Sequence, residues 1–191
     1  RLAGYGREGR WVALSILFMH CYGNENNWKS CKDYLLVLVS GDNLLLNENN
    51  PNRLDYHHWS ETVIKLLKES TDSGFALQIS KQIVEACTKS PLISLDSFAS
   101  NVVRNLVEKY FGEVWEIFGT GLLGDFITFF KLKDLMGSKR GWLGADNIIF
   151  DSDERNKVVL EWCAKYPTIA PKRIANMMPL EKKIGEQIDW H

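Results

Sequence analysis

The sequence predicts an all-α protein in which about eight to ten helices pack into an irregular α-solenoid. Three observations support this fold class. Apolar residues recur at helical spacing along most of the chain, strand-like alternation is nearly absent, and one pattern of residues occurs twice. Residues 1–191 are interpreted as a single helical domain. Because the chain starts at Arg1 rather than Met and stops at Trp190-His191, we expect a fragment of a longer protein.

The N-terminal half reads as helices joined by turns. The apolar run from Trp11 to Cys21 predicts a buried helix, and it is shorter than the roughly 20 apolar residues that cross a bilayer. Residues 35–39 contain enough β-branched side chains to form a strand, but they also fit one face of a helix. Asp55 is the expected N-cap of the next helix. Its buried stripe follows i, i+4, i+7 and i+8 spacing and comprises Trp59, Val63, Leu66 and Leu67.

The C-terminal half continues this pattern. Residues 114–135 are almost continuously apolar and predict two short buried helices around a glycine turn. That turn would contain Gly119, Gly121 and Gly124. Residues 137–150 predict a loop between two sub-bundles. Asp151 or Ser152 is expected to cap the helix that follows, and Pro171 fits the first turn of the last helix.

A faint repeat supports the solenoid arrangement. Val102-Val103 and Lys109-Tyr110 match Val158-Val159 and Lys165-Tyr166 at the same spacing. Helix pairs that recur in this way stack into solenoids of the HEAT or armadillo type, whose repeats span about 40–47 residues. The sequence therefore predicts a degenerate, HEAT-like array with insertions.

Composition and charge limit the classes of partner. Hydrophobic residues make up 45% of the chain and charged residues 25%, which is typical of a soluble globular protein. The net charge is −1, so no overall field attracts nucleic acid or an anionic membrane. The four cysteines are widely spaced and predict reduced thiols rather than a disulfide framework. We therefore expect a cytoplasmic protein without a membrane partner.

Motifs for chemistry are weak. The pattern GxGxxG occurs at residues 4–9 and 119–124, but neither match follows a predicted strand, as a dinucleotide site requires. His57 and His58, near Asp55 and Glu61, could suggest metal or acid–base chemistry, but the sequence offers no evident third ligand for a catalytic zinc. We expect no catalytic residue, cofactor or metal in this segment, and a small hydrolase or nuclease stays an alternative.

Basic residues with a nearby tryptophan supply the candidate binding surface. They are Lys139, Arg140, Lys172 and Arg173, together with Trp142. If the four basic side chains share one face, they could contact a nucleic-acid backbone, and a nucleic-acid-binding helical module is the second alternative. If they are scattered, they form part of a solvated surface.

The segment 162–171, followed by Met178-Pro179-Leu180 and Trp190-His191, resembles helical C-terminal regions of large bacterial multidomain proteins. These include antiphage defence proteins with an NTPase core or an N-terminal effector. The resemblance is clear over about the last forty residues and looser back to Asp55. It implies a non-catalytic sensor or scaffold that binds a protein partner or other domains of its own chain. Its motifs concern packing, so no catalytic residue is carried over.

Overall fold

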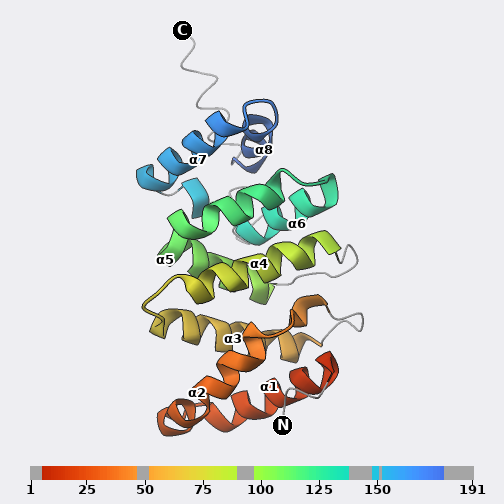
Figure 1. The fold of residues 1–191 in the computed structure, drawn as a ribbon, viewed down its shortest axis with the longest axis vertical. Coiled ribbons are helices and arrows are strands. Elements are labelled where there is room, and N and C mark those ends of the chain that lie inside the picture. The colour runs from red at the N-terminus through yellow and green to blue at the C-terminus, as the bar shows by residue number, and fades with distance from the viewer. Residues whose placement is uncertain (1–5, 47–51, 90–96, 138–147, 151, 179–191) are drawn as a thin grey trace.

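The computed structural model describes residues 6–46, 52–89, 97–137, 148–150 and 152–178. Within them the chain forms α-helices and two short 3-10 helices and contains no strand, which confirms the all-α prediction for these residues. The α-helices are α1 (Arg7–Cys21), α2 (Glu25–Ser40), α3 (Arg53–Glu69), α4 (Gly74–Lys89), α5 (Ser97–Leu122), α6 (Phe126–Met136), α7 (Asp153–Lys165) and α8 (Ala170–Met177). The 3-10 helices are η2 (Leu44–Leu46) and η3 (Ile148–Phe150). In Figure 1 the helices succeed one another along the long axis, from α1 and α2 at one end to α7 and α8 at the other.

Helices α1 and α2 form the N-terminal end. The Asn24 side chain caps α2 by accepting two backbone N–H groups of its first turn. Residues 35–39 lie in this helix and not in a strand, because Leu35, Leu38 and Val39 fall on its buried face. The Arg10 side chain is also buried and joins the two helices, since its guanidinium donates to the backbone oxygen of Leu38.

Helix α3 begins earlier than the sequence predicts. Asn52 is its N-cap, and the Asn52 side chain accepts the N–H of Asp55 at 2.9 Å. The Asp55 carboxylate in turn accepts the N–H of Asn52 at 3.3 Å. Asp55 is therefore the third residue of the helix and the second partner in a capping box, and it is not the N-cap. The two reciprocal hydrogen bonds satisfy two backbone N–H groups that would otherwise be unpaired. The predicted stripe on α3 is buried, with Trp59 and Val63 fully inaccessible.

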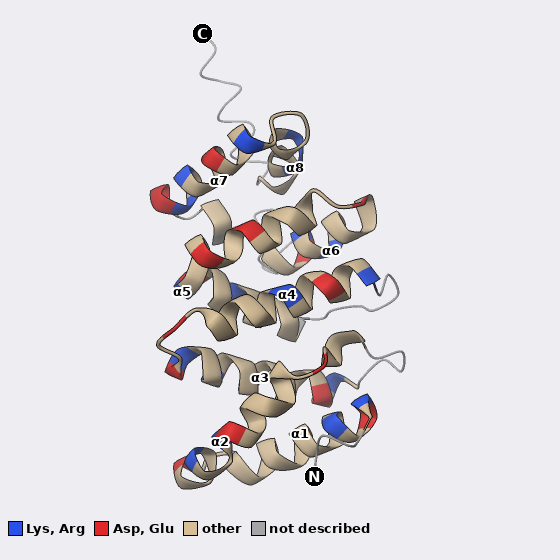
Figure 2. Cartoon of the chain, viewed as in Figure 1, with Lys and Arg blue, Asp and Glu red and all other residues tan. Residues whose placement is uncertain are grey.

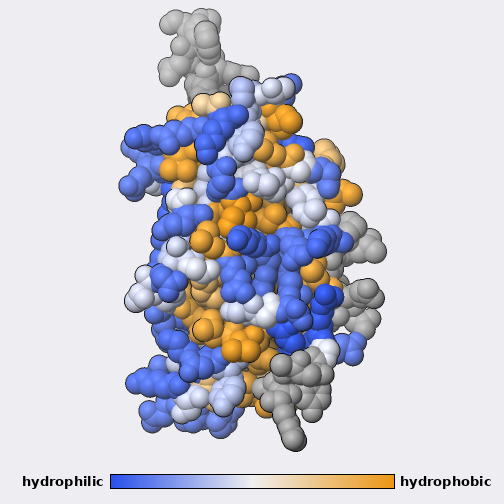
Figure 3. Space-filling view, viewed as in Figure 1, coloured by the Kyte–Doolittle hydropathy of each residue, from blue (hydrophilic) through white to orange (hydrophobic). Residues whose placement is uncertain are grey.

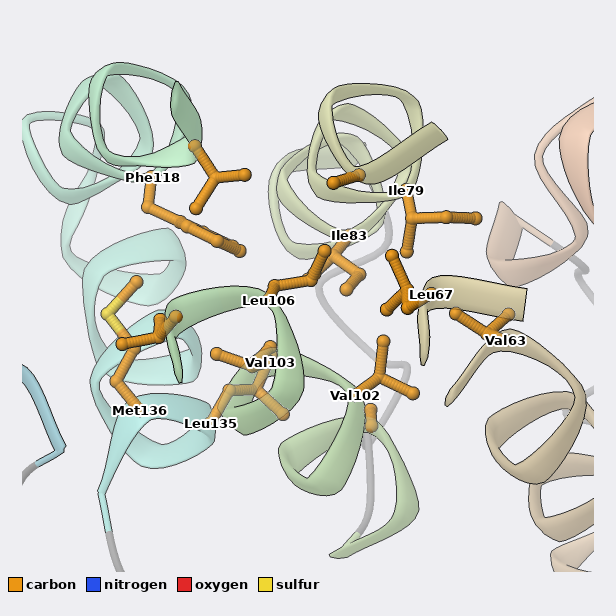
Figure 4. Packing of buried hydrophobic residues seen from close by; sticks show 14 of the residues in the cluster. Val63, Leu67, Ile79, Ile83, Val102, Val103, Leu106, Phe118, Leu135 and Met136 are labelled. Atoms are coloured by element: carbon orange, nitrogen blue, oxygen red, sulfur yellow. The ribbon is translucent and has the colours of Figure 1, made fainter. Parts of the chain in front are cut away.

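The main core lies between α3, α4, α5 and α6 (Figure 4). Leu67 of α3 faces Ile79 and Ile83 of α4, and Val63 and Leu67 lie close to Val102 of α5. On the other side of α5, its side chains approach Leu135 and Met136 of α6. These side chains are all at most 3% exposed. Each buried aliphatic side chain contributes about 1.5–3 kcal/mol, so this cluster dominates the stability of the fold.

Helix α5 bends at Tyr110, where the backbone leaves helical geometry (φ −132°, ψ 29°). At the bend, Lys109 and Tyr110 reach the C-terminal end of α3. The Lys109 ammonium donates to the carbonyl oxygens of Leu67 at 2.8 Å and Ser70 at 2.9 Å. The Tyr110 hydroxyl lies 3.3 Å and 3.2 Å from the same two oxygens. A cation and a hydroxyl thus complete the hydrogen bonds that the last turn of α3 cannot make itself.

The glycines at 119 and 121 do not form the expected turn. Both lie inside α5, and only Gly124 belongs to the turn between α5 and α6. A Cβ at position 119 would lie 2.6 Å from the indole nitrogen of Trp162, and one at position 121 would clash with Leu132. These glycines therefore let neighbouring helices approach closely, which accounts for the second GxGxxG pattern without any nucleotide.

The predicted loop at 137–150 is only partly described. Gly137 ends α6 by donating its N–H to the Lys133 carbonyl at 2.9 Å, and residues 138–147 lie outside the described part. Ile148–Phe150 correct the prediction, because they form η3, which packs against α5 and α7 with Ile149 fully buried. Pro171 occupies the first turn of α8, as predicted. None of the described helices is long and apolar enough to cross a membrane.

Candidate recognition surface

Exposed large hydrophobic side chains are concentrated in α1 and α2 and again from α6 onwards. Among the described residues from 52 to 122, only Leu54 is one. In α1, by contrast, Val12, Ile16 and Met19 are about 60% exposed and lie on one face. This stripe corrects the expectation that the helix over residues 11–21 is wholly buried. Beyond α5, the densest group is on α6.

The first two turns of α6 present three exposed hydrophobic side chains. Phe126 is 68% exposed, Ile127 52% and Phe130 39%. Phe126 and Phe130 are one turn apart, and their ring centroids lie 4.3 Å from each other. Figure 3 shows hydrophobic residues reaching the surface at the edge of the stack beside α6. The two rings form a continuous aromatic surface on one helix.

Asp125 fixes the start of α6. Its carboxylate accepts the backbone N–H of Thr128 at 2.8 Å and the Thr128 hydroxyl at 3.1 Å. The hydrogen bond from the Thr128 N–H holds the pKa of Asp125 below its usual value, with further lowering from the nearby Arg173. Phe126 therefore stands on a well-capped first turn, and its exposure is not the result of a frayed helix end.

Two cations border the aromatic surface. The Arg173 guanidinium, from α8, lies 4.4 Å from the centroid of the buried Phe129 ring and donates to the Gly124 carbonyl at 3.0 Å. The Lys133 ammonium lies 5.4 Å from the Phe130 centroid. Phe129 and Phe130 are themselves in edge contact at 5.4 Å, so the cations and rings are joined. We call the set Phe126, Ile127, Phe130, Lys133 and Arg173 the α6–α8 surface.

The sequence predicted part of this surface. Arg173 lies within it, and the exposed Lys172 precedes Arg173 in α8. Lys139, Arg140 and Trp142 lie outside the described residues, so whether the four basic side chains share a face stays a prediction. Sequence reasoning missed the aromatic residues of α6, because a continuous apolar run was interpreted as core. The available signal was that the first five residues of α6, 126–130, are almost all apolar, although a surface helix can bury only part of its circumference.

A second polar cluster lies between α1 and α3. The Ser15 hydroxyl lies 3.0 Å from Asp55 Oδ1 and 2.9 Å from His58 Nδ1. Because a carboxylate only accepts, the hydroxyl donates to Asp55 and accepts from the Nδ1–H of His58. In a hydrolytic triad the histidine stands between serine and carboxylate, whereas here the serine stands in the middle. This order connects two helices but leaves His58 unable to take the proton of Ser15.

The described residues contain no group of three His, Cys, Asp or Glu side chains that could hold a metal ion. Asp55, His57, His58 and Glu61 therefore do not form such a group among the described residues. Charges of both signs are interspersed along the face in Figure 2, without a continuous basic stripe there. This distribution favours local contacts over a long electrostatic track for nucleic acid.

Comparisons with known proteins found no match: no family model, no curated protein and no solved structure matches this chain.

Proposed function

We propose that the chain is a HEAT-like α-solenoid that acts as a non-catalytic recognition or scaffold module and binds a protein ligand. Alternate helices contact one another, with α1 next to α3, α3 next to α5 and α5 next to α7, while α2 contacts α4 and α4 contacts α6. This supports two layers of helices that advance together. HEAT and armadillo arrays are built in this way, each repeat contacting its neighbours.

The spacing of long-range hydrogen bonds supports the same proposal. The bond from Trp28 to Glu69 spans 41 residues, that from Ser60 to Phe98 spans 38, and that from Tyr110 to Leu67 spans 43. A HEAT-type repeat contains about 40–47 residues, so side chains of one repeat meet the next at this separation.

The sequence repeat also has a structural counterpart. Tyr110 and Tyr166 both stand where the helical backbone is interrupted, with φ of −132° and −126°. Three pairs of equivalent positions around these tyrosines are buried in both copies. They are Val103 and Val159, Leu106 and Trp162, and Val114 and Ala170. Burial therefore agrees at these three pairs, although Tyr110 is buried within α5 and Tyr166 is 38% exposed at the end of α7. The partial agreement supports a common unit.

Binding of a protein ligand is proposed for the α6–α8 surface. The single observation that carries it is the exposed pair Phe126 and Phe130 on a capped helix, bordered by Arg173. Aromatic and arginine side chains supply most of the energy at protein interfaces, and they do so best when held rigidly. The resemblance to helical regions of bacterial defence proteins suggests a foreign protein as the ligand, and this stays a prediction.

A displayed peptide library selected on the folded chain tests the proposal. We expect the selected peptides to lose at least about tenfold in affinity on the double variant Phe126→Asp, Phe130→Asp. Val37→Asp is the matched control, because Val37 is 68% exposed on α2 at the other end of the stack. Equal loss with the control, or no loss with the double variant, would contradict a recognition role for the α6–α8 surface.

A further inference from the structure

We infer that the α6–α8 surface, if it binds protein as proposed above, binds an acidic amphipathic helix of its partner. The first step is geometric. Phe126, Phe130 and Lys133 occupy positions i, i+4 and i+7 of α6 and so lie on one side of a straight helix, over a length of about 10 Å. A stripe of this spacing is the pattern that a second helix meets when it lies alongside, with its own apolar residues at i, i+4 and i+7.

The second step concerns the cations of the surface. The five ion pairs among the described residues all lie elsewhere: Arg10–Asp42, Lys32–Glu69, Lys65–Glu25, Lys89–Glu85 and Lys165–Glu116. Lys133 and Arg173 instead lie over aromatic rings, and no carboxylate in the described part of the chain pairs with them or with Lys172. None of these three cations therefore forms a salt bridge within the described residues.

The third step concerns the carboxylates that could neutralise these cations from within. Asp125 interacts electrostatically with Arg173 and offsets part of its charge, while its oxygens also accept from Thr128. Asp134, next to Lys133 on α6, is exposed. Two carboxylates therefore stand against the three cations Lys133, Lys172 and Arg173. Helix α8 contains Lys172 and Arg173 but no acidic residue. A surface that combines exposed rings with an excess of positive charge is complementary to apolar side chains flanked by carboxylates.

Three synthetic peptides of about sixteen residues test the inference. They share one apolar stripe of Leu and Phe at i, i+3, i+4 and i+7, and their other positions are all Glu, all Gln or all Lys. We expect the Glu peptide to bind the wild-type chain about tenfold more tightly than the Gln peptide, with the Lys peptide weakest. Its affinity should fall as the salt concentration rises, because the paired charges are screened.

Two pairs of variants separate charge from contact. Lys133→Glu with Arg173→Glu should abolish the preference for the Glu peptide. Lys29→Glu with Lys68→Glu, on the exposed faces of α2 and α3, makes the same change in net charge and should preserve it. Thermal melts of all four proteins verify that the fold is kept. Arg173→Gln gives an independent reading of the guanidinium and should weaken the Glu peptide more than the Gln peptide.

The outcomes distinguish this inference from the proposal on which it rests. If the Gln peptide binds as tightly as the Glu peptide and both require Phe126 and Phe130, the acidic partner is wrong while the recognition role stands. If no peptide binds, or if binding ignores both phenylalanines, the acidic-helix inference is overturned, and the library selection alone then decides the recognition role. If a single-stranded DNA oligonucleotide binds more tightly than the Glu peptide and loses affinity on Lys133→Glu, the surface recognises nucleic acid and the inference is overturned.

Discussion

Helices α3, α4 and α5 contain the same kinds of apolar residue as α1 and α6, which lie on either side of them, but use these residues differently. Val63, Ile79 and Leu106 are fully buried between α3, α4 and α5, whereas Ile16 is 63% exposed and Phe126 68% exposed. All five lie in regular helices, so their own helices do not decide their burial. The number of closely packed neighbouring helices does, because among the described residues α5 packs against α3, α4, α6 and α7, while the main neighbours of α1 are α2, α3 and η2.

The exposed apolar surfaces of α1 and α6 also differ from each other. The α1 stripe consists of Val12, Ile16 and Met19, none of which carries an aromatic ring or a charge. The α6–α8 surface is aromatic and is bordered by Lys133 and Arg173. An aliphatic stripe provides contact area but little specificity for one partner over another. Aromatic rings together with cations can distinguish partners by their pattern of charge. The difference indicates why recognition is proposed for α6 rather than for α1.

Truncation of a central residue should have the largest effect. Leu106→Ala removes a fully buried side chain from the junction of α4, α5 and α6, and we expect a loss of about 2–5 kcal/mol in the free energy of unfolding. Phe126→Ala, at an exposed site, should change it by less than about 0.5 kcal/mol. Urea denaturation followed by tryptophan fluorescence measures both. Similar losses for the two variants would mean that Phe126 belongs to the core.

The two glycines of α5 should respond to alanine with opposite signs. Gly119→Ala places a methyl group 2.6 Å from the Trp162 indole, which is itself buried against Trp115, and overpacking of this kind destabilises by about 1–3 kcal/mol. Gly112→Ala meets no atom within 4 Å, and the higher helix propensity of Ala should stabilise by up to about 1 kcal/mol. The two unfolding midpoints, measured in the same urea series, check this. A stabilising effect at position 119 would show that the Trp162 ring can move.

Secondary structure was the part of the molecule that the sequence predicted well. Local rules place helix starts. Pro171 lies in the first turn of α8 as predicted, and Ser152, one of the two predicted caps, occupies the N-cap position of α7, although its side chain makes no capping hydrogen bond. The error at the start of α3 has a local cause too. A capping box has two polar residues three positions apart, and the sequence alone favoured the second, Asp55, over Asn52.

The candidate site was less predictable because exposure depends on tertiary packing. Phe129 and Phe130 are adjacent and chemically identical, yet one is 2% and the other 39% exposed. Only the position of α6 at the edge of the stack separates them. Likewise, Ser15 meets His58 across 43 residues of chain, and no local pattern announces that contact. The HEAT-like arrangement, the protein ligand and the family resemblance stay predictions.

A smaller effect is expected at the contact between α5 and the end of α3. Tyr110→Phe removes the hydroxyl that reaches the carbonyl oxygens of Leu67 and Ser70, and we expect a loss of about 0.5–1.5 kcal/mol in the free energy of unfolding. The matched control is Tyr34→Phe, since Tyr34 is 62% exposed on α2. Chemical denaturation of both variants measures the difference, and equal stability of the two would show that Lys109 alone completes the end of α3.

The smallest effect is expected from pH, at the contact between α1 and α3. Burial lowers the pKa of His58, the nearby His57 lowers it further, and Asp55 partly opposes this. The unfolded chain takes up the proton near its ordinary pKa of about 6.5, before the folded chain does. Stability is therefore complete above about pH 6.5 and falls as the pH decreases towards the lower pKa of the folded state.

Urea midpoints measured between about pH 7.5 and pH 5 should show this decline. His58→Gln should flatten that part of the profile. The same substitution lowers stability at every pH, because it removes the hydrogen bond to Ser15. His20→Gln is the matched control, because His20 is exposed at the end of α1 and makes no comparable contact with α3 through its ring. A His58→Gln profile as steep as that of the wild type would assign the acid sensitivity to other groups and leave the α1–α3 contact independent of pH. A flattened profile would instead identify this contact as the part of the N-terminal end that weakens first in acid. The packing of α3, α4 and α5 should stay unchanged, because Val63, Ile79 and Leu106 carry no titrating group.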